Sequence, residues 1–434
     1  MKEFFKTNGQ LVIVFLVLVF AGILAKETAF LLVPLTLIML KYKNRYMEMI
    51  MVFSLLLCLA DSRHHMFDFA KIIKDIALVI LSLFVFIDSS QFKERSKLFM
   101  PFALFLLLSF VLSARHPDPL GSFQKILSYT LLLVAVPNYF LRELNIDGAF
   151  FMRNMVWFYV VILLFGLFLS LPMPEITYLQ ERYCGLLGNP NSIGTFCTLL
   201  VILITLTRHH YPGIFSRNQL YLMIGIILIS VLLSRSRNCI FSILIFLFFT
   251  RFYKISHLYG FIIVIFIALI FQVINENLVY IINSLGLGTY LRVEQLEDGS
   301  GRLLAWNFAW QEIQNNFWIG RGFAYEEYLF KLNADMLSAL GHQGGVHNTY
   351  LAIWLNTGLL GLILFLIGFF RIFFTAAIKN YLAIPVLFTL VFSINFEPWF
   401  QSSLNPFTIM ALLIITLLQF TPHATEEKSI VPVL

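Results

Sequence analysis

The chain has 434 residues, of which 59% are hydrophobic and only 12% are charged. A soluble domain is about 45–50% apolar and about 25% charged, so this composition excludes a soluble protein and predicts one that is embedded in a membrane. The formal net charge of +6 does not indicate nucleic-acid binding, because in a membrane protein the placement of Lys and Arg matters more than their sum.

Apolar segments follow one another along the whole chain, and we expect them to form an all-α, polytopic membrane helical bundle. About fourteen segments are present, with twelve spans as the alternative count, because most are shorter than the ~20 residues that cross a bilayer. They fall at 11–25, 28–40, 46–60, 72–87, 98–113, 122–140, 152–171, 191–206, 219–233, 238–250, 258–274, 347–370, 381–396 and 404–420. The chain thus divides into helices over 1–274, one large outer-face loop over 275–346, and C-terminal helices with a short tail over 347–434.

Basic residues recur in alternate loops, and Lys and Arg are enriched on the cytoplasmic side of membrane proteins. This alternation predicts that both the N-terminus and the C-terminus are cytoplasmic. The cytoplasmic side then receives Lys2, Lys6, Lys41, Lys43, Arg45, Lys93, Arg95, Lys97, Arg142, Arg153, Arg208, Arg217, Arg251, Lys254, Arg371, Lys379 and Lys428. The outer side holds fewer basic residues, among them Arg182, Arg235, Arg237, Arg302 and Arg321.

Two of the outer arginines, Arg235 and Arg237, stand at a tight turn between two apolar segments. One interpretation places both side chains at the membrane interface, where they extend toward lipid headgroups. The other is an anion site, because guanidinium is the favoured side chain for bidentate contact with phosphate. Two arginines on the side that positive charge normally avoids favour the anion site.

A third outer arginine, Arg182, opens a stretch that ends in Gly188, Asn189, Pro190 and Asn191 just before an apolar segment. Proline at the first position of a helix is preorganised for that conformation, so the stretch predicts a capped helix N-terminus. A helix N-terminus also favours a bound anion. The two roles are compatible.

The long outer loop contains a predicted amphipathic helix. Leu303, Trp306, Trp310 and Ile313 recur at spacings of three to four residues, and tryptophan suits the bilayer interface. Arg302 opens this helix, at the end where the helix dipole disfavours a cation. We expect the helix to lie across the mouth of the bundle as a lid that carries Arg302 over it.

Two residues of the outer face are candidates for a general base. His347 follows Gly344 and Gly345, and it is either an interfacial polar group or a base, because neutral imidazole accepts a proton near pH 7. Glu397 in the last outer loop is the second candidate, with a solvated charge at a helix end as its alternative. The outer face offers no clear acidic cluster for a metal, so we expect neither a metal nor another cofactor.

Four motifs occur in one order along the second half of the chain. They are Gly185-Leu-Leu-Gly-Asn-Pro-Asn191, the turn Ser236-Arg237, the helix from Arg302 to Trp306 that ends at Gly320-Arg321-Gly322, and His347-Asn348-Thr349-Tyr350-Leu351 followed by Gly358-Leu-Leu-Gly361. Together they resemble the O-antigen ligase and O-antigen polymerase superfamily of bacterial envelope glycosyltransferases. The resemblance covers roughly residues 182–365.

The resemblance implies an inverting, metal-independent glycosyltransferase of the bacterial inner (plasma) membrane, with its active site on the periplasmic face. Its donor would be a glycan on undecaprenyl diphosphate. Arg237 and Arg302 would hold the diphosphate, and His347 would act at the reacting centre.

Other residues of the same motifs and loops complete the predicted site. Further candidates for contact with the diphosphate are Arg182, Arg235 and Arg321. The asparagines of the motifs, Asn189, Asn191 and Asn348, are expected to shape the binding region.

The function has two alternatives within the family and one outside it. A polymerase joins lipid-linked repeat units, whereas a ligase moves the glycan onto lipid A core; we favour the polymerase because such enzymes serve several polysaccharide systems. A transporter of lipid or polysaccharide is the alternative of another class, but internal repeats, which transporters often show, are not evident. Expected partners are the lipid-linked donor, a glycan or lipid A core acceptor, membrane lipids and a chain-length regulator, without nucleic acid.

Overall fold

The computed structural model describes residues 2–88, 90–255, 302–342, 344–401 and 404–421, together with 259 and 262. Over these residues the protein is almost entirely helical, which confirms the predicted all-α class. The longer helices are α1 (Lys2–Leu24), α2 (Lys26–Tyr42), α3 (Tyr46–Asp61), α4 (Asp68–Ile87), α5 (Ala103–Leu112), α6 (Pro119–Leu169), α8 (Pro190–His210), α9 (Arg217–Ser234), α10 (Arg237–Ile255), α14 (Arg302–Asn315), α17 (Thr349–Ala377), α18 (Ala383–Ile394) and α19 (Pro406–Gln419). The shorter elements are η1 (His65–Phe67), η2 (Met100–Phe102), η3 (Ser113–Arg115), α7 (Pro174–Thr177), the antiparallel pair β1 (Tyr178–Leu179) and β2 (Arg182–Tyr183), α15 (Tyr325–Leu332) and α16 (Ala334–Ala339).

The predicted apolar segments coincide with these helices, with one pair joined in α6. The segments 122–140 and 152–171 both lie in α6, whose backbone leaves the helical region at Asp147 (φ −152°, ψ 81°). The Asp147 carboxylate accepts a hydrogen bond from the backbone N–H of Phe150 at 2.9 Å and thereby caps the second half of α6. The predicted segment 258–274 and the first part of the long loop fall almost wholly outside the described residues.

Several helices have the length and composition of membrane spans. In the described part of the chain, five are long and apolar enough to cross a bilayer: Phe4–Leu24, Pro119–Leu169, Pro190–His210, Arg217–Ser234 and Thr349–Ala377. Shorter apolar helices lie at Ala29–Tyr42, Met100–Arg115, Ala383–Ile394 and Pro406–Gln419. The protein is therefore a multi-pass membrane protein, and the number of its spans stays a prediction.

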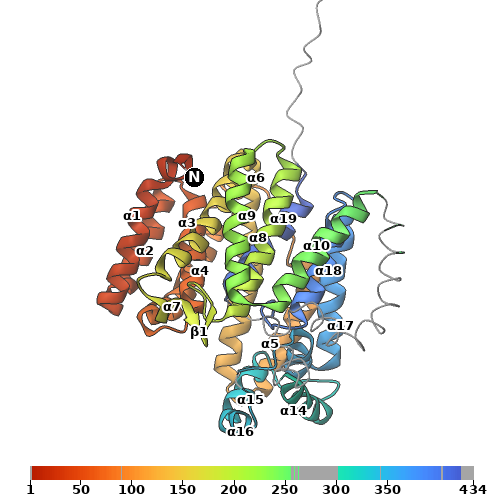
Figure 1. Cartoon of the computed structure of the whole chain (residues 1–434). Helices are drawn as coiled ribbons and strands as arrows, with labels where there is room; N and C mark the ends of the chain where they lie inside the picture. The colour runs from red at the N-terminus through yellow and green to blue at the C-terminus, as the bar shows by residue number, and fades with distance from the viewer. Residues whose placement is uncertain are drawn as a thin grey trace, which may run out of the picture.

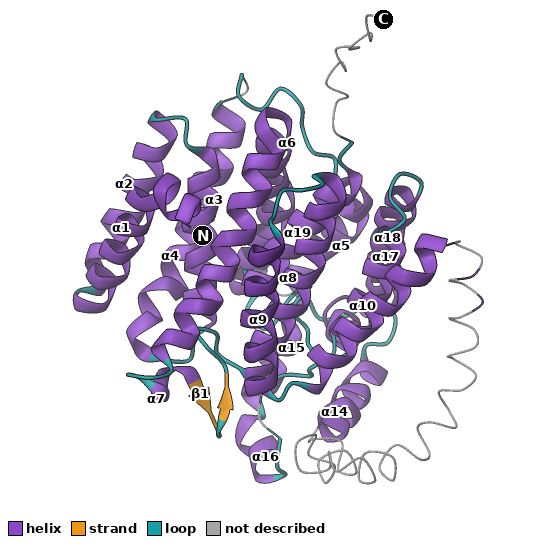
Figure 2. Cartoon of the chain, turned by 45° about the horizontal axis from the view of Figure 1, so that its top comes forward, coloured by secondary structure: helices purple, strands orange, loops and turns teal. Residues whose placement is uncertain are grey.

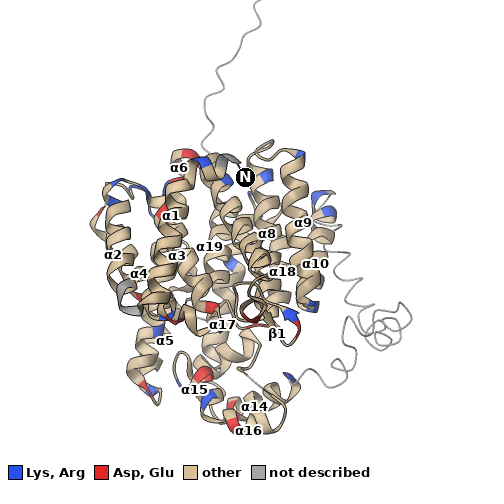
Figure 3. Cartoon of the chain, turned by 60° about the vertical axis from the view of Figure 1, so that its left-hand side comes forward, with Lys and Arg blue, Asp and Glu red and all other residues tan. Residues whose placement is uncertain are grey.

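The spanning helices stand side by side in one bundle, and α14, α15 and α16 gather at one end of it, opposite the N-terminus (Figure 1). The turned view in Figure 2 shows the same arrangement, with the short pair β1 and β2 near this end as well. Charged residues lie mainly toward the two ends of the bundle, and the helices between carry few of them (Figure 3). This separation is expected of helices that cross a membrane.

The helix α14 packs on α17 through two small side chains and part of the predicted apolar stripe. Ala305, Ala309 and Ile313 are buried in a hydrophobic cluster with residues of α17. Trp310 of the stripe is 41% exposed, and its ring contacts that of Trp354 in α17, with the ring centroids 5.4 Å apart. Two alanines one turn apart allow the helix backbone to approach α17 closely.

A break in α17 explains the glycines of the last two motifs. Gly358 adopts φ +73° and ψ −179°, a conformation that is essentially restricted to glycine. The segment that follows α14 lies against this break: the Leu359 N–H donates to the carbonyl of Phe317 at 2.8 Å, and a Cβ on Gly358 would lie 2.3 Å from the Trp318 carbonyl oxygen. A Cβ on Gly320 would likewise lie 2.4 Å from the Asn356 carbonyl in α17. Both glycines are therefore required by backbone contact.

The turn before α8 is built in a similar way. A Cβ on Gly188 would lie 2.1 Å from the carbonyl oxygen of Asp61 at the end of α3, so only glycine fits between these segments. Asn189 caps α8 by accepting a hydrogen bond from the backbone N–H of Asn191 at 2.8 Å, and Pro190 is the first helical residue. The predicted cap is confirmed, and it turns the start of α8 toward the α14–α16 end.

Candidate active site

Glu397, in the loop between α18 and α19, contacts residues from three other parts of the chain. Its side chain is only 15% exposed. One carboxylate oxygen accepts a hydrogen bond from Asn191 Nδ2 at 2.9 Å and lies 3.5 Å from Arg302 Nη2. The other oxygen lies 3.2 Å from His347 Nδ1. Arg302, His347 and Glu397 therefore meet in one cluster, and Glu397 is a buried partner of two predicted site residues rather than a solvated charge.

His347 is held in an unusual backbone conformation at this cluster. Its φ is +50°, which is uncommon for a residue with a side chain and marks positions where the surrounding structure enforces the conformation. The next residue, Asn348, caps α17 by accepting hydrogen bonds from the N–H groups of Tyr350 and Leu351 at 2.9 and 3.0 Å. Its own amide donates to Asn395 Oδ1 at 2.9 Å, in the Glu397 loop. Asn348 thus fixes His347 and Glu397 relative to each other.

Arg302 reaches the cluster from the first turn of α14. Its guanidinium lies 5.5 Å from the centre of the Phe396 ring, next to Glu397. One turn further on, the Trp306 indole N–H donates to the carbonyl of Val346 at 3.0 Å. Since Val346 directly precedes His347, this bond ties the start of α14 to the loop that presents the imidazole. The helix thus lies over the bundle and carries Arg302 there, as predicted.

Arg182 connects the start of α8 to the turn between α9 and α10. Its Nε donates to the Ser234 carbonyl at 3.0 Å, and its Nη2 donates to Asn191 Oδ1 at 3.2 Å. Asn191 in turn donates to Glu397, so only the Asn191 side chain lies between Arg182 and the cluster. Arg182 is therefore close enough to contribute positive charge to a ligand bound there.

The turn between α9 and α10 places its two arginines differently. Arg235 ends α9 in the left-handed conformation (φ +49°) and is exposed. Arg237 begins α10 and is half-buried. The turn itself packs against α8, where a Cβ on Gly194 would lie 2.6 Å from Ser236 Oγ. Arg237 is therefore carried by a turn that lies against the same helix as Asn191.

Arg321 lies apart from this cluster. It follows α14 at the end opposite Arg302, and a 14-residue helix is about 21 Å long. Its guanidinium is exposed and lies 5.8 Å from the centre of the Tyr325 ring. The structure therefore does not bring Arg321 together with the other predicted residues.

The charges around Glu397 determine its protonation. Burial by itself raises the pKa of Glu397, but the charge and hydrogen bond of His347, together with Arg302 and Asn191, outweigh burial and hold the pKa below its ordinary value. The carboxylate is therefore ionised at neutral pH and can orient the imidazole and stabilise its protonated form. A cation and an imidazole–carboxylate pair at one position can stabilise a negatively charged leaving group and accept a proton from a hydroxyl.

Sequence reasoning missed Glu326, which accepts a hydrogen bond from the loop that presents His347. This residue of α15 is buried, and its carboxylate accepts a hydrogen bond from the Val346 N–H at 2.8 Å. A Cβ on Gly345 would lie 2.4 Å from the same oxygen, so a side chain there would displace the carboxylate. The Glu326 N–H donates to Asn356 Oδ1 at 2.8 Å. A glutamate in a polar loop gives no signal of burial in a single sequence.

Glu326→Gln is expected to flatten the pH dependence of stability. Burial raises the pKa of Glu326 from 4.5 to about 7, so the folded protein holds this proton more tightly than the unfolded chain does. The resulting stabilisation is fully present below pH 4.5 and is lost as the pH rises through 7. It amounts to about 3 kcal/mol over that range at about 1.36 kcal/mol per pKa unit.

The measurement is the melting temperature of the purified protein in detergent between pH 4.5 and 8. The wild type should lose stability across this window, and the Glu326→Gln variant should lose much less. Asp335→Asn, at an exposed position of α16, is the control and should keep the wild-type slope. Equal slopes for wild type and Glu326→Gln would show that Glu326 is not the titrating group.

Comparison with known protein families adds one finding. Residues 221–366 match the family model described as O-antigen ligase. The matched part includes Arg235, Arg237, Arg302 and His347, but it ends before Glu397. No curated protein matches the chain. The match coincides with the part of the chain that carries the cluster's arginine and histidine, and it supports the resemblance of this part to the superfamily of O-antigen ligases and polymerases.

Proposed function

We propose that the protein polymerises oligosaccharide repeat units carried on undecaprenyl diphosphate, at the outer face of the bacterial inner membrane. The reaction proceeds with inversion and uses arginines rather than a metal ion to neutralise the leaving group. The observation that carries this proposal is the contact of Arg302 and His347 with the same carboxylate, at 3.5 and 3.2 Å. A cation that can bind phosphate, Arg302, and a group that can accept a proton, His347, thus both contact Glu397.

The chemistry follows from these positions. An acceptor hydroxyl attacks the anomeric carbon of the donor sugar, a new carbon–oxygen bond forms, and the bond from that carbon to the diphosphate oxygen breaks. The diphosphate leaves with increasing negative charge, which Arg302 stabilises most strongly in the transition state. The hydroxyl proton passes to His347, with Glu397 stabilising the imidazolium that results; direct transfer to Glu397 is the alternative.

The remaining arginines extend the positive region. Arg182 donates to Asn191, which touches Glu397, and Arg237 starts the helix after the turn that Arg182 contacts. A diphosphate carries several acceptor oxygens, and guanidinium groups bind them in a bidentate manner. Arg302 and Arg237 are accordingly assigned to the diphosphate, with Arg182 next to them.

A ligase is the second candidate, and the description of the matching family favours it. Donor, leaving group and cluster would be the same in a ligase. The acceptor would differ, because a ligase moves the glycan to lipid A core instead of to another lipid-linked repeat unit.

Incubation of the purified protein in detergent with a fluorescent lipid-linked repeat unit tests the proposal. A polymerase should give a ladder of products that differ by one repeat unit and stay on the diphosphate lipid. Addition of lipid A core should leave that ladder unchanged. The ladder should persist in EDTA, because the arginines neutralise the leaving group.

Each other outcome has a distinct meaning. Transfer of label to lipid A core without a ladder would identify a ligase. Absence of any product in micelles, with movement of the lipid across the membrane in vesicles, would identify a transporter. Loss of all transfer in EDTA would contradict the metal-independent mechanism.

A further inference from the structure

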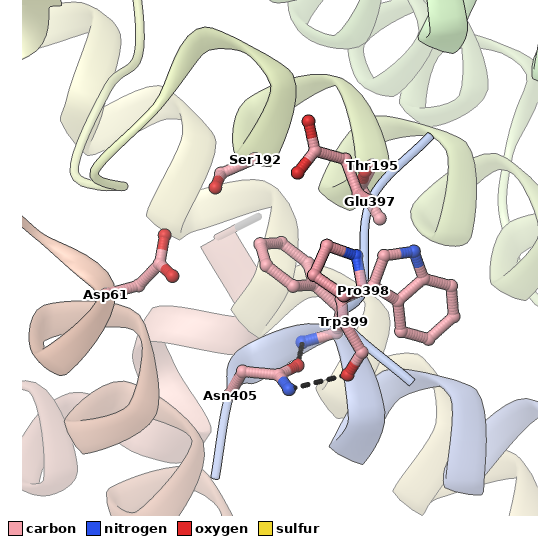
Figure 4. A pocket seen from close by; sticks show the side chains of 8 residues that line it. Asp61, Ser192, Thr195, Glu397, Pro398, Trp399 and Asn405 are labelled. Carbon is pink, nitrogen blue, oxygen red and sulfur yellow. Dashed lines mark hydrogen bonds between the residues drawn. The ribbon is translucent and has the colours of Figure 1, made fainter. Parts of the chain in front are cut away.

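A cavity of about 160 Å³ lies directly beside Glu397. It is lined by the end of α3, the first turns of α8 and the start of α19, and Figure 4 shows the Asp61 and Glu397 carboxylates on either side of Ser192. Arg302 and His347 do not line it. Glu397 therefore connects this cavity to the arginine and the imidazole, which both contact its carboxylate.

The polar atoms of the cavity suit a ligand that both donates and accepts hydrogen bonds. Asp61 and Glu397 supply acceptors, and Ser192 and Thr195 supply hydroxyls. Sugar hydroxyls can serve both as acceptors and as donors.

The other walls of the cavity suit a sugar ring. Pro398, Trp399 and Phe407 give it an apolar side, which suits the carbon–hydrogen face of a sugar. At about 160 Å³ the cavity has room for at least one such ring. Two carboxylates in the wall disfavour a diphosphate, because like charges repel.

Asp61 is held firmly for such a contact. Its carboxylate accepts a hydrogen bond from the Gly188 N–H at 3.1 Å and another from the Ser192 hydroxyl. The missing side chain of Gly188 lets the Asp61 backbone approach closely. An acceptor that is already fixed loses little conformational entropy when it binds a hydroxyl.

We propose that this cavity binds the terminal sugar ring of the acceptor glycan. Asp61 hydrogen-bonds to a hydroxyl that does not react, and the reacting hydroxyl lies at Glu397, between the cavity and His347. This assignment rests on the proposed glycan transfer and extends it to the acceptor. Asp61 is a specificity-determining residue, since it touches the acceptor but not the bonds that form and break.

Protection of an introduced cysteine tests sugar binding independently of catalysis. Ser192→Cys places a thiol in the cavity wall, and the native Cys58, Cys184, Cys197 and Cys239 are all buried, so background labelling with a maleimide should be low. The probe is the free repeat-unit oligosaccharide, released from the lipid-linked donor by mild acid. It should slow labelling of Ser192→Cys at least about fivefold, and it should leave Asp335→Cys, at an exposed position of α16, unchanged.

Two further substitutions connect the protection to the cavity. Thr195→Val, added to Ser192→Cys, removes one hydroxyl with little change of shape and should weaken protection. Asp61→Asn keeps an acceptor for the Gly188 N–H but removes the charge. In the transfer assay it should raise the KM for the free oligosaccharide acceptor about tenfold and change kcat little, which a purely structural defect would not do.

The outcomes separate this proposal from the proposed function. Unprotected labelling at saturating oligosaccharide, in a preparation that catalyses transfer, would overturn the acceptor site and leave the polymerase intact. Protection without any transfer would support the sugar site and contradict the polymerase. Equal protection by farnesyl diphosphate would assign the cavity to the donor, and protection by Ca²⁺ alone would make it a cation site; either result would overturn the proposal.

Discussion

Arg302→Ala is expected to lower kcat for glycan transfer by about 10²–10³-fold, as for the loss of one group that stabilises developing negative charge. The guanidinium lies at the first turn of α14, 21% exposed and 3.5 Å from Glu397. Its loss removes the cation that faces the departing diphosphate, whereas the buried face of α14, with Ala305 and Ala309, remains. The measurement is the initial rate of ladder formation in detergent, together with the melting temperature.

Two controls sharpen this prediction. Arg302→Lys should retain part of the activity, because lysine keeps the charge but lacks the bidentate fork. Lys331→Ala, which removes an exposed cation from α15, should retain wild-type activity. Wild-type turnover by Arg302→Ala would contradict the role of Arg302 at the leaving group.

Glu397→Gln is expected to cause a comparable loss of kcat and to change the pH profile. The carboxylate accepts from Asn191, faces Arg302 and lies 3.2 Å from His347 Nδ1. The amide keeps the size of the side chain but removes the charge that favours a protonated imidazole. The acidic limb of the rate profile should therefore move to lower pH, because His347 holds its proton less tightly without the carboxylate.

The matched experiment on the other partner identifies the base. If His347 takes the proton, His347→Ala should reduce kcat by about 10²–10⁴-fold, with substrate binding largely retained. If His347→Ala keeps near-normal turnover while Glu397→Gln does not, the carboxylate is the base. A Glu397→Gln enzyme with the wild-type rate and pH profile would remove Glu397 from the mechanism altogether.

Part of the site was predictable from residue types in context. Arginines on the outer side of a membrane protein are unusual by the charge rule, and this is how Arg182, Arg237 and Arg302 became candidates. The rule depends on the loop in which an arginine lies and not on its neighbours in space. It therefore also selected Arg321, which lies beyond the end of α14 opposite Arg302.

The sequence by itself determined the membrane class, the positions of most helices and the cap of α8, because apolar length and capping residues act locally. It also indicated the superfamily through motifs whose glycines are required by close backbone contacts at Gly188 and Gly358.

Only the tertiary structure decided which charges meet. Glu397, beyond the matched family region, is the residue that joins Arg302, His347 and Asn191, and Asp61 lies across the cavity from it although more than half of the chain separates them. Packing also decided that Ala305 and Ala309 of α14 face α17, which the apolar stripe alone did not indicate. These contacts depend on how helices distant in sequence pack together, and no local pattern in the chain encodes that.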